Sequence, residues 1–274
     1  MVTYAAEADN PDRGFLASIA LDGSDERSIV GPAGRRGAAV NVGPAVSPDG
    51  KLVAFQRAMT PDRPLPPLVY VVPLDASRPE RRLIRGRAPE VDPAWSPDGS
   101  EVAFARAVRG RFDLFACTPD GSRIRQLTDT PDVDEIAPAW SPGGERIAFA
   151  RYESGVDGGP GDLWVMSANG GGEKRLLADR HNYGSPSWSP DGKRIALVQD
   201  GHVAVMRADG AAAPKRITDE PVLKEWRPSW SPDGTRIVFT RDPGTILIVD
   251  PDGSHLAEVP FGKPATGAVW GPAK

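Results

Sequence analysis

The sequence has very few of the residues that build disulfides, metal sites and catalytic triads. Its 274 residues include one cysteine, Cys117, which excludes an internal disulfide, and only three histidines. It contains no G-x-S-x-G, H-E-x-x-H or C-x-x-C motif, so the usual nucleophile elbow and zinc signatures are missing. These absences argue against the commonest enzyme classes without excluding every enzyme.

Strong charge and long apolar runs are missing as well. The formal net charge is -4, which provides no field to attract nucleic acid or anionic lipid. No apolar run is long enough to span a bilayer, and the opening "MVTYAAEADNPDRG" contains no charged-then-apolar leader. We therefore expect no nucleic-acid partner and no membrane insertion. The chain is expected to be a monomer that is either cytoplasmic or a mature domain.

Glycine and proline, by contrast, are abundant and recur at fixed offsets beside aspartate. The stretch "PAWSPDGSEVAFAR" begins at Pro93, and close copies begin at Pro44, Pro138, Pro186 and Pro228. A sixth, shortened copy, "GAVWGPAK", closes the chain. The tryptophan position of the six copies is occupied by Val46, Trp95, Trp140, Trp188, Trp230 and Trp270. A period of 40 to 49 residues indicates stacked units such as propeller blades.

One repeat, residues 93–128, has the sequence pattern expected of a four-stranded antiparallel blade. "PAWSP" and "EVAFARA" flank a Pro-Asp-Gly turn, and "FDLFACT" and "RIRQLTD" flank a second one. No stretch keeps a helical period, so the chain is predicted to be all-β. Residues 60–67 and 154–162, rich in proline or glycine, are expected to be surface loops.

The two ends of the chain predict how the ring closes. The first 30 residues match strands two, three and four of a blade, and residues 267–272 match a first strand. The last strand is therefore expected to pair with the first, which removes a free sheet edge. We predict one domain, residues 1–274, forming a six-bladed β-propeller.

These motifs resemble a known family. The pattern P-[AS]-W-S-P-D-G-x-x-[IV]-[AV]-F, followed by "DLWVM" and "RLL", is similar to the WD40-like PD40 repeat of TolB-like six-bladed propellers. The resemblance covers nearly the whole chain and departs at Val46 and Gly143. It implies a non-enzymatic interaction platform for a peptide or protein, working in the periplasm or outside the cell.

The repeated residues themselves are predicted to be structural. Each repeated aspartate lies in a Pro-Asp-Gly turn, where its side chain bonds the nearby backbone. The tryptophans are expected to wedge between neighbouring sheets. Function is therefore sought in the stretches that precede each P-x-W, at the mouth of the central channel, where a ligand site is most common. The candidate ligand-binding residues there are Glu90, Asp92, Asp134, Glu135, His181, Asn182, Tyr183, Lys224, Glu225, Trp226 and Arg227.

Two alternatives stay open at this stage. In the first, the protein is a lyase or hydrolase on a sugar or peptide, with His181 and Tyr183 as acid and base. In the second, a divalent cation such as calcium binds Asp92, Asp134 and Glu135, because hard cations take carboxylate oxygens. The leading interpretation has neither a catalytic residue nor a cofactor.

Overall fold

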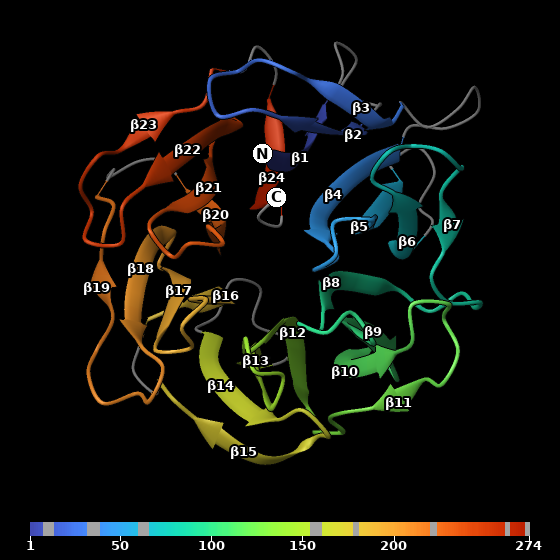
Figure 1. Cartoon of the computed structure of the whole chain (residues 1–274). Coiled ribbons are helices and arrows are strands. Elements are labelled where there is room, and N and C mark those ends of the chain that lie inside the picture. Colours follow the sequence, from blue (N-terminus) through green and yellow to red (C-terminus); the bar gives the residue numbers. More distant parts are fainter. Residues whose placement is uncertain are drawn as a thin grey trace.

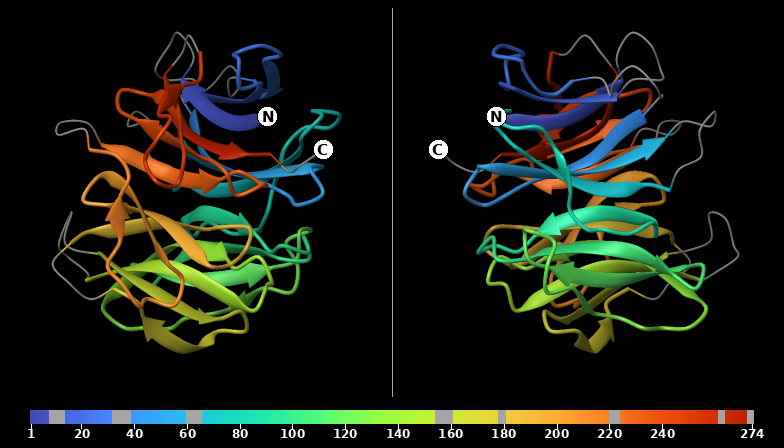
Figure 2. Two further views of the ribbon diagram at one scale, coloured as in Figure 1. Left: turned by 60° about the vertical axis from the view of Figure 1, so that its left-hand side comes forward. Right: turned by 90° about the vertical axis from the view of Figure 1, so that its right-hand side faces the viewer.

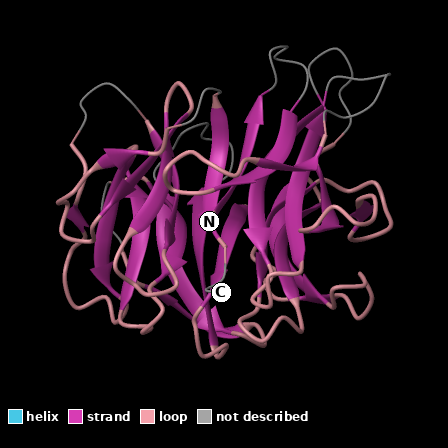
Figure 3. Ribbon diagram, turned by 45° about the horizontal axis from the view of Figure 1, so that its top comes forward, coloured by secondary structure: helices cyan, strands magenta, loops and turns pink. Residues whose placement is uncertain are grey.

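The computed structural model describes residues 1–7, 14–31, 39–59, 66–153, 161–177, 181–219, 224–260 and 264–271. Their strands form six sheets of four antiparallel strands each, arranged in a ring around a central axis (Figure 1). No helix occurs among these residues (Figure 3), and accordingly none that could cross a membrane. The all-β, six-bladed prediction is confirmed. The loops expected at residues 60–67 and 154–162 lie mostly outside the described residues.

Each sheet places its first strand next to the axis and its fourth strand at the rim (Figure 1). The inner strands are β4 (Ala39–Val46), β8 (Glu90–Trp95), β12 (Val133–Trp140), β16 (Tyr183–Trp188), β20 (Glu225–Trp230) and β24 (Ala265–Trp270). The second strands are β1 (Val2–Glu7), β5 (Leu52–Met59), β9 (Val102–Val108), β13 (Arg146–Glu153), β17 (Arg194–Gln199) and β21 (Ile237–Arg241).

The outer two strands of each sheet complete the meander. The third strands are β2 (Gly14–Ile19), β6 (Leu68–Pro73), β10 (Arg111–Cys117), β14 (Gly161–Ser167), β18 (His202–Arg207) and β22 (Thr245–Val249). The fourth strands are β3 (Arg27–Val30), β7 (Arg81–Arg82), β11 (Arg125–Gln126), β15 (Gly171–Arg175), β19 (Lys215–Arg216) and β23 (Ala257–Glu258). The sheets pack face to face around the axis (Figure 2), so the hydrophobic core is divided into clusters between neighbouring blades.

The repeated turn between the first two strands is held by its own serine and aspartate. In blade β4–β7 the Ser47 hydroxyl donates to Asp49 Oδ1 at 2.7 Å and accepts the N–H of Leu52 at 2.9 Å. Asp49 Oδ1 also accepts the N–H of Lys51 at 3.0 Å. The glycine that follows has φ +68°, the left-handed region that glycine enters without a steric cost. The repeated aspartate is thus a turn former, as predicted.

The turns and the tryptophans tie each blade to the preceding one. A Cβ built on Gly99 would contact Pro48 Cγ at 3.4 Å, and Gly144, Gly192 and Gly234 lie against the turn proline of the preceding blade in the same way. The Trp95 indole N–H donates to the carbonyl of Ala45 at 3.0 Å, and Trp188 and Trp230 make the same bond to their neighbours. The tryptophans therefore sit between sheets, and burying them stabilises the ring by area and by hydrogen bonding.

The ring closes where the two ends of the chain meet. β24 pairs antiparallel with β1, with Val2 opposite Trp270 and Tyr4 opposite Ala268. The Gly271 N–H donates to the Met1 carbonyl at 3.0 Å. The sixth sheet therefore has the order β24-β1-β2-β3, which confirms the predicted closure. Residue 272, the last of the expected strand, lies outside the described residues.

Candidate functional site

A β-bulge interrupts the inner strands three residues before the tryptophan position. The register with the second strand shifts there in β4, β8, β12, β16 and β20. A bulge leaves one residue unpaired and turns it away from the ladder. The bulged residues adopt positive φ values of 48° to 58°, and they are Gly43, Asp92, Ala137, Ser185 and Arg227. Because the bulge recurs in five blades, its backbone strain belongs to the fold and does not by itself mark a site.

These bulges border a central cavity of about 300 Å³ to which all six inner strands contribute. Its lining includes the prolines and small residues of the repeat, which leave the axis open. Two of the bulged residues in this lining are charged, Asp92 and Arg227. Five inner strands thus share a bulged position that carries a different residue in each, and four of these five residues line the cavity.

Asp92 and Arg227 form an ion pair although 135 residues separate them in sequence. Arg227 Nη2 lies 2.5 Å from Asp92 Oδ1. Their strands, β20 and β8, belong to blades on opposite sides of the ring, so the pair crosses the axis (Figure 1). The Asp92 side chain is 12% exposed and that of Arg227 is 32% exposed. The two charges therefore close part of the channel mouth.

Two glycines leave the space through which Arg227 reaches across. A Cβ built on Gly43 would lie 2.6 Å from Arg227 Nη1, and one built on Gly267 would lie 3.4 Å from Arg227 Cδ. Both glycines occupy the inner strands of the two blades between β20 and β8 on one side. The other two blades carry Ala137 and Ser185 at this position. The missing side chains at Gly43 and Gly267 therefore leave the space that the Arg227 side chain occupies.

Tyr152 borders the same region from the end of β13. Burial, reinforced by the negative charge of Asp92, raises the pKa of Tyr152 to about 12. Its hydroxyl donates to the Tyr183 carbonyl at 3.2 Å and fits over Gly184, where a Cβ would come within 2.7 Å. Tyr152 thus remains a neutral hydrogen-bond donor at the mouth under ordinary conditions.

The three predicted glutamates lie inside the blades and do not face the channel. Glu90, Glu135 and Glu225 are all fully buried on their inner strands. Glu225 Oε1 accepts two bonds from Arg241, at 3.0 Å from Nε and 2.7 Å from Nη2. Glu135 accepts bonds from Nε and Nη2 of Arg151 in the same way. Each pair joins the first two strands of its own blade.

Glu225 is also tied to the preceding blade. Its second oxygen accepts the Val203 N–H at 2.8 Å and the hydroxyl of Thr218. A buried carboxylate needs such donors because desolvation of an unpaired charge is costly. Glu225 therefore holds two strands and two blades together.

Glu90 is the exception in this series. Its pKa is raised by burial, an effect that the charges of Arg106 and Arg82 offset only in part, and neither of its oxygens completes a hydrogen bond among the described residues. Ile217 and Leu83 bond the equivalent carbonyls of Val203 and Val69, so the residue that corresponds to Thr218 is Ile84. The hydroxyl that serves Glu225 has no counterpart for Glu90.

Three more predicted residues lie where inner strands begin, outside the lining of the central cavity: Asp134 on β12, and His181 and Asn182 just before β16. Asp134 Oδ1 accepts the Phe112 N–H of the neighbouring blade at 2.8 Å. His181 Nδ1 lies 2.5 Å from Asp200 Oδ2, and the His181 side chain is 46% exposed. The Asn182 N–H donates to the other oxygen of Asp200 at 2.8 Å. These groups orient one another within their own sector.

Tyr183 and Trp226 differ sharply in exposure. Tyr183 is 1% exposed and packs in the core between two blades, whereas Trp226 is 43% exposed. The Trp226 indole N–H donates to Asp242 Oδ1 at 3.3 Å, and Lys224, the residue before β20, is an exposed cation. Lys224, Trp226 and Arg227 thus lie together where β20 begins, and Arg227 is the one of these three that lines the cavity.

The three carboxylates considered for a cation do not converge. Asp92 pairs with Arg227, Asp134 with a backbone N–H, and Glu135 with Arg151. Among the described residues, no three histidine, cysteine or acidic side chains gather closely enough to hold a metal ion. The Asp92 carboxylate is therefore already engaged by the Arg227 guanidinium.

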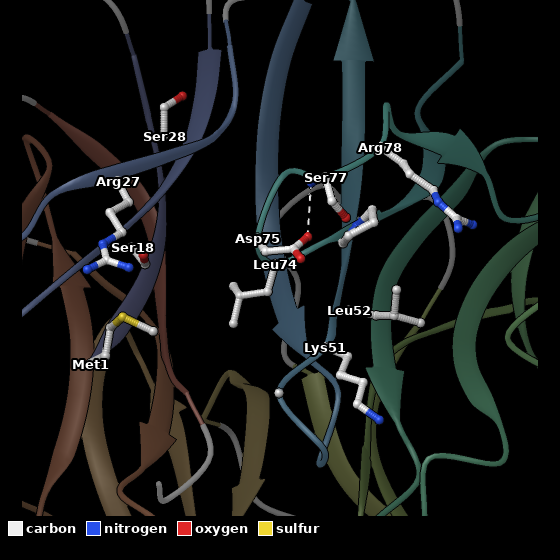
Figure 4. A pocket seen from close by; sticks show the side chains of 12 residues that line it. Met1, Ser18, Arg27, Ser28, Lys51, Leu52, Leu74, Asp75, Ser77 and Arg78 are labelled. Atoms are coloured by element: carbon white, nitrogen blue, oxygen red, sulfur yellow. Dashed lines mark hydrogen bonds between the residues drawn. The ribbon is translucent and has the colours of Figure 1, made fainter.

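Two further hollows lie away from the mouth, where the blade formed by β24, β1, β2 and β3 meets its neighbours. One, of about 600 Å³, is bordered by residues of β2, β3 and the loop after β6, including Arg27, Leu74 and Arg78 (Figure 4). The other, of about 960 Å³, shares Met1, Arg27 and Leu74 with it and extends to Trp270. The second hollow is lined in part by residues of the repeated turn, among them Asp49, Ser231 and Asp233.

Sequence reasoning missed one signal that was present. Glu90, Glu135 and Glu225 each stand five residues before a repeat tryptophan, and Arg106, Arg151 and Arg241 stand eleven residues after it. This shared spacing marks the glutamates as part of the repeat. The Asp92–Arg227 contact has no such signal, because the two residues come from opposite blades.

Comparisons with known proteins agree with this architecture. A family model described as the TolB beta propeller domain, PD40, matches residues 2–274. No curated protein matches the chain in sequence. Among solved structures, TolB from Acinetobacter baumannii superposes with a TM-score of 0.78 at 20% identity, covering 99% of this chain and 66% of that one. The chain thus spans just under two-thirds of that relative.

Two other solved structures extend the likeness. A candidate TolB from Agrobacterium tumefaciens has a TM-score of 0.72 at 21% identity, covering 97% of this chain and 91% of that one. A chain of a nidogen/laminin complex has a TM-score of 0.77 at 13% identity, with coverages of 98% and 97%. At such identities the likeness concerns the fold alone, since one fold serves many functions.

Proposed function

Because the chain belongs to the TolB beta propeller domain family, we propose that it is a non-enzymatic binding module that holds a peptide or protein segment at the channel mouth. The observation that carries this proposal is the cavity itself. Five inner strands share one bulged backbone conformation yet carry glycine, alanine, serine, aspartate and arginine there, and all but the glycine line the cavity. Positions that keep the backbone but vary in side chain are suited to recognition.

The mouth has the chemical composition of a binding surface. Trp226 offers an exposed indole, and aromatic side chains are enriched among the residues that anchor partners. Lys224 and Arg227 stand beside it on the same edge. An apolar anchor with adjacent cations suits a segment that carries both apolar and acidic groups. Periplasmic or extracellular location and a monomeric state are part of the same proposal and rest on family resemblance.

A second candidate, an enzyme, is favoured by one observation. His181 and Asp200 form a pair in which the carboxylate orients the imidazole, the arrangement used by general bases. Asp200 is shared with Arg216, at 2.8 Å, and Tyr183 is buried, so the proposed acid has no access to a substrate. The binding module is therefore the better-supported function.

The test is capture of a partner by matched variants. Immobilised wild-type protein, Trp226→Ala and the control Leu256→Ala are exposed to extract and culture supernatant of the source organism. Leu256 belongs to the same blade and is 45% exposed, close to the 43% of Trp226, but lies near β23 at the rim. We expect a bound protein or peptide that is lost with Trp226→Ala and retained by Leu256→Ala. Equal capture by all three would contradict a site at the mouth.

A further inference from the structure

The ion pair across the channel is the feature that the repeat does not explain. At the bulge position, the six inner strands carry two charges of opposite sign, and both belong to one contact. The neighbouring glycines keep the path of Arg227 open. A structural strut would be expected between adjacent blades, as with Glu225 and Val203, whereas this one spans the site where a ligand would enter.

The contact leaves most of the guanidinium unused. It joins one nitrogen of Arg227 to one oxygen of Asp92. A guanidinium offers five N–H donors in a planar fork that matches a carboxylate with two parallel bonds. The Arg227 side chain is also the more exposed of the two, at 32% against 12%. An incoming group would therefore meet the cation first and could bind it better than Asp92 does.

The other charges at the mouth favour an anion over a cation. Asp200 is engaged by His181 and Arg216, and Asp134 by a backbone N–H. Asp242 accepts the indole N–H of Trp226. Lys224, by contrast, forms no ion pair within the described part of the chain. The acids are thus already satisfied, and the available charge on this edge is positive.

We propose that the mouth recognises a carboxylate of its ligand, which takes the place of Asp92 on Arg227. The proposal rests on the function proposed above and names the chemistry of that ligand: an acidic side chain or a free C-terminus of a peptide. Asp92 then acts as an internal competitor that occupies the cation until the ligand arrives. Because bound and closed states compete, removing the competitor strengthens binding.

The experiment uses three short peptides as probes: acetyl-triglycine as the free acid, acetyl-triglycine amide, and acetyl-Gly-Glu-Gly amide. Binding is measured by NMR titration of protein labelled with ¹⁵N on arginine, at low salt because exposed charges are screened. The first and third probes separate a terminal carboxylate from a side-chain carboxylate. The second probe carries no carboxylate and serves as the blank.

We expect Asp92→Asn to bind the better acidic probe about tenfold more tightly than wild type, since a half-exposed ion pair no longer competes. Arg227→Gln should lose binding, and Arg227→Lys should be intermediate because a lysine cannot form the bidentate contact. Arg207→Gln removes an arginine from an exposed ion pair with Asp209 at the end of β18, away from the cavity lining, and should bind like wild type. The melting temperature of each variant is measured alongside, to show that each is folded.

Equal binding of acid and amide probes would overturn the inference, as would Asp92→Asn binding the acids no more tightly than wild type. Should Asp92→Asn fail to fold, Arg227→Gln and Arg227→Lys decide the matter, because both retain Asp92: binding unaffected by either would overturn the inference. A failure here is distinct from failure of the proposed function. In that case Trp226→Ala would still lose the captured partner, and only the carboxylate chemistry would be wrong.

Discussion

Two arginine–carboxylate pairs in this molecule have the same chemistry and opposite surroundings. Glu225 and Arg241 lie on neighbouring strands of one blade, 0% and 11% exposed, and Glu225 has both oxygens filled. Asp92 and Arg227 come from opposite blades, are more exposed and share a single contact. The first pair has counterparts in other blades, whereas the second has none.

The difference separates charges that build the fold from charges that are available to a ligand. A buried pair that is fully bonded cannot exchange partners without leaving a desolvated charge. A half-exposed, singly bonded pair can exchange, because water or another ion can replace either partner at little cost. The buried pair recurs in other blades and has its hydrogen bonds filled, and both properties indicate a structural role. The cross-channel pair has neither property, so it is available to a ligand.

The largest expected effect comes from removing a whole inner strand. Deleting residues 262–274 removes β24, leaves β1 without its partner and uncovers the buried side chains of Val2 and Tyr4. We expect the melting temperature to fall by more than about 10 °C, or cooperative unfolding to be lost. Calorimetry measures this, and a synthetic peptide of residues 262–274 added in excess should restore part of the loss. An unchanged melt would contradict the closure by β24.

The next largest effect tests the buried pair. Glu225→Ala leaves Arg241 buried without its carboxylate and removes the acceptor for Val203 and Thr218. We expect a loss of about 3–5 kcal/mol in the free energy of unfolding, measured by urea denaturation. Glu258→Ala, an exposed glutamate of the same blade, should stay within about 0.5 kcal/mol of wild type. Similar losses for both would mean that burial does not distinguish these carboxylates.

A pH dependence tests the carboxyl group beside the repeated glutamates. Burial, reinforced by the charge of Glu135, raises the pKa of Asp113 from 3.8 to about 6. The folded state therefore holds this proton more tightly, so stability is highest below pH 4 and falls as the pH rises to about 6. We expect Asp113→Asn to remove up to about 3 kcal/mol of that decline, from about 1.4 kcal/mol per pKa unit. Urea midpoints at pH 4 and pH 7 measure it, with the exposed Asp219→Asn in another blade as control. Equal slopes in wild type and Asp113→Asn would refute it.

The smallest effect concerns the stability supplied by the pair across the channel. Asp92→Asn should change the free energy of unfolding by less than about 1 kcal/mol, because the pair is partly exposed and singly bonded. Urea denaturation of Asp92→Asn and Glu225→Ala under the same conditions makes the comparison direct. A loss for Asp92→Asn as large as that for Glu225→Ala would show that the cross-channel pair is a structural strut.

The fold could be predicted from the sequence because its signals are local and repeated. The turn chemistry of Ser47 and Asp49 acts over five residues, and the same bonds recur in later copies such as Ser96 and Asp98. The pairing of the two chain ends followed from counting strands in the first and last copies. Local hydrogen bonding and a fixed period were enough to define six blades.

The site was harder to predict because its contacts are not local. The sequence predicted that the residues before each P-x-W lie at the mouth, and of the eleven candidates Asp92 and Arg227 line the central cavity. Strand alternation buries Glu135 in its blade, whereas the bulge turns Asp92 toward the axis. No periodicity reveals which bulge residues meet across the ring. The exposure of Trp226 and the burial of Tyr183 depend on packing between blades, which the spacing of aromatic residues does not specify.

The seam between β1 and β24 also has a mechanical consequence. The strands are antiparallel, and Val2 lies opposite Trp270, so the start of β1 and the end of β24 lie at the same end of the sheet. A force that pulls the two ends apart would load the hydrogen bonds one after another, starting with the bond between Gly271 and Met1. The same bonds pulled along the strand axis would resist together. Pulling the two ends apart is therefore expected to open the β1–β24 pairing one hydrogen bond at a time, whereas heating must disrupt the packing of all six blades.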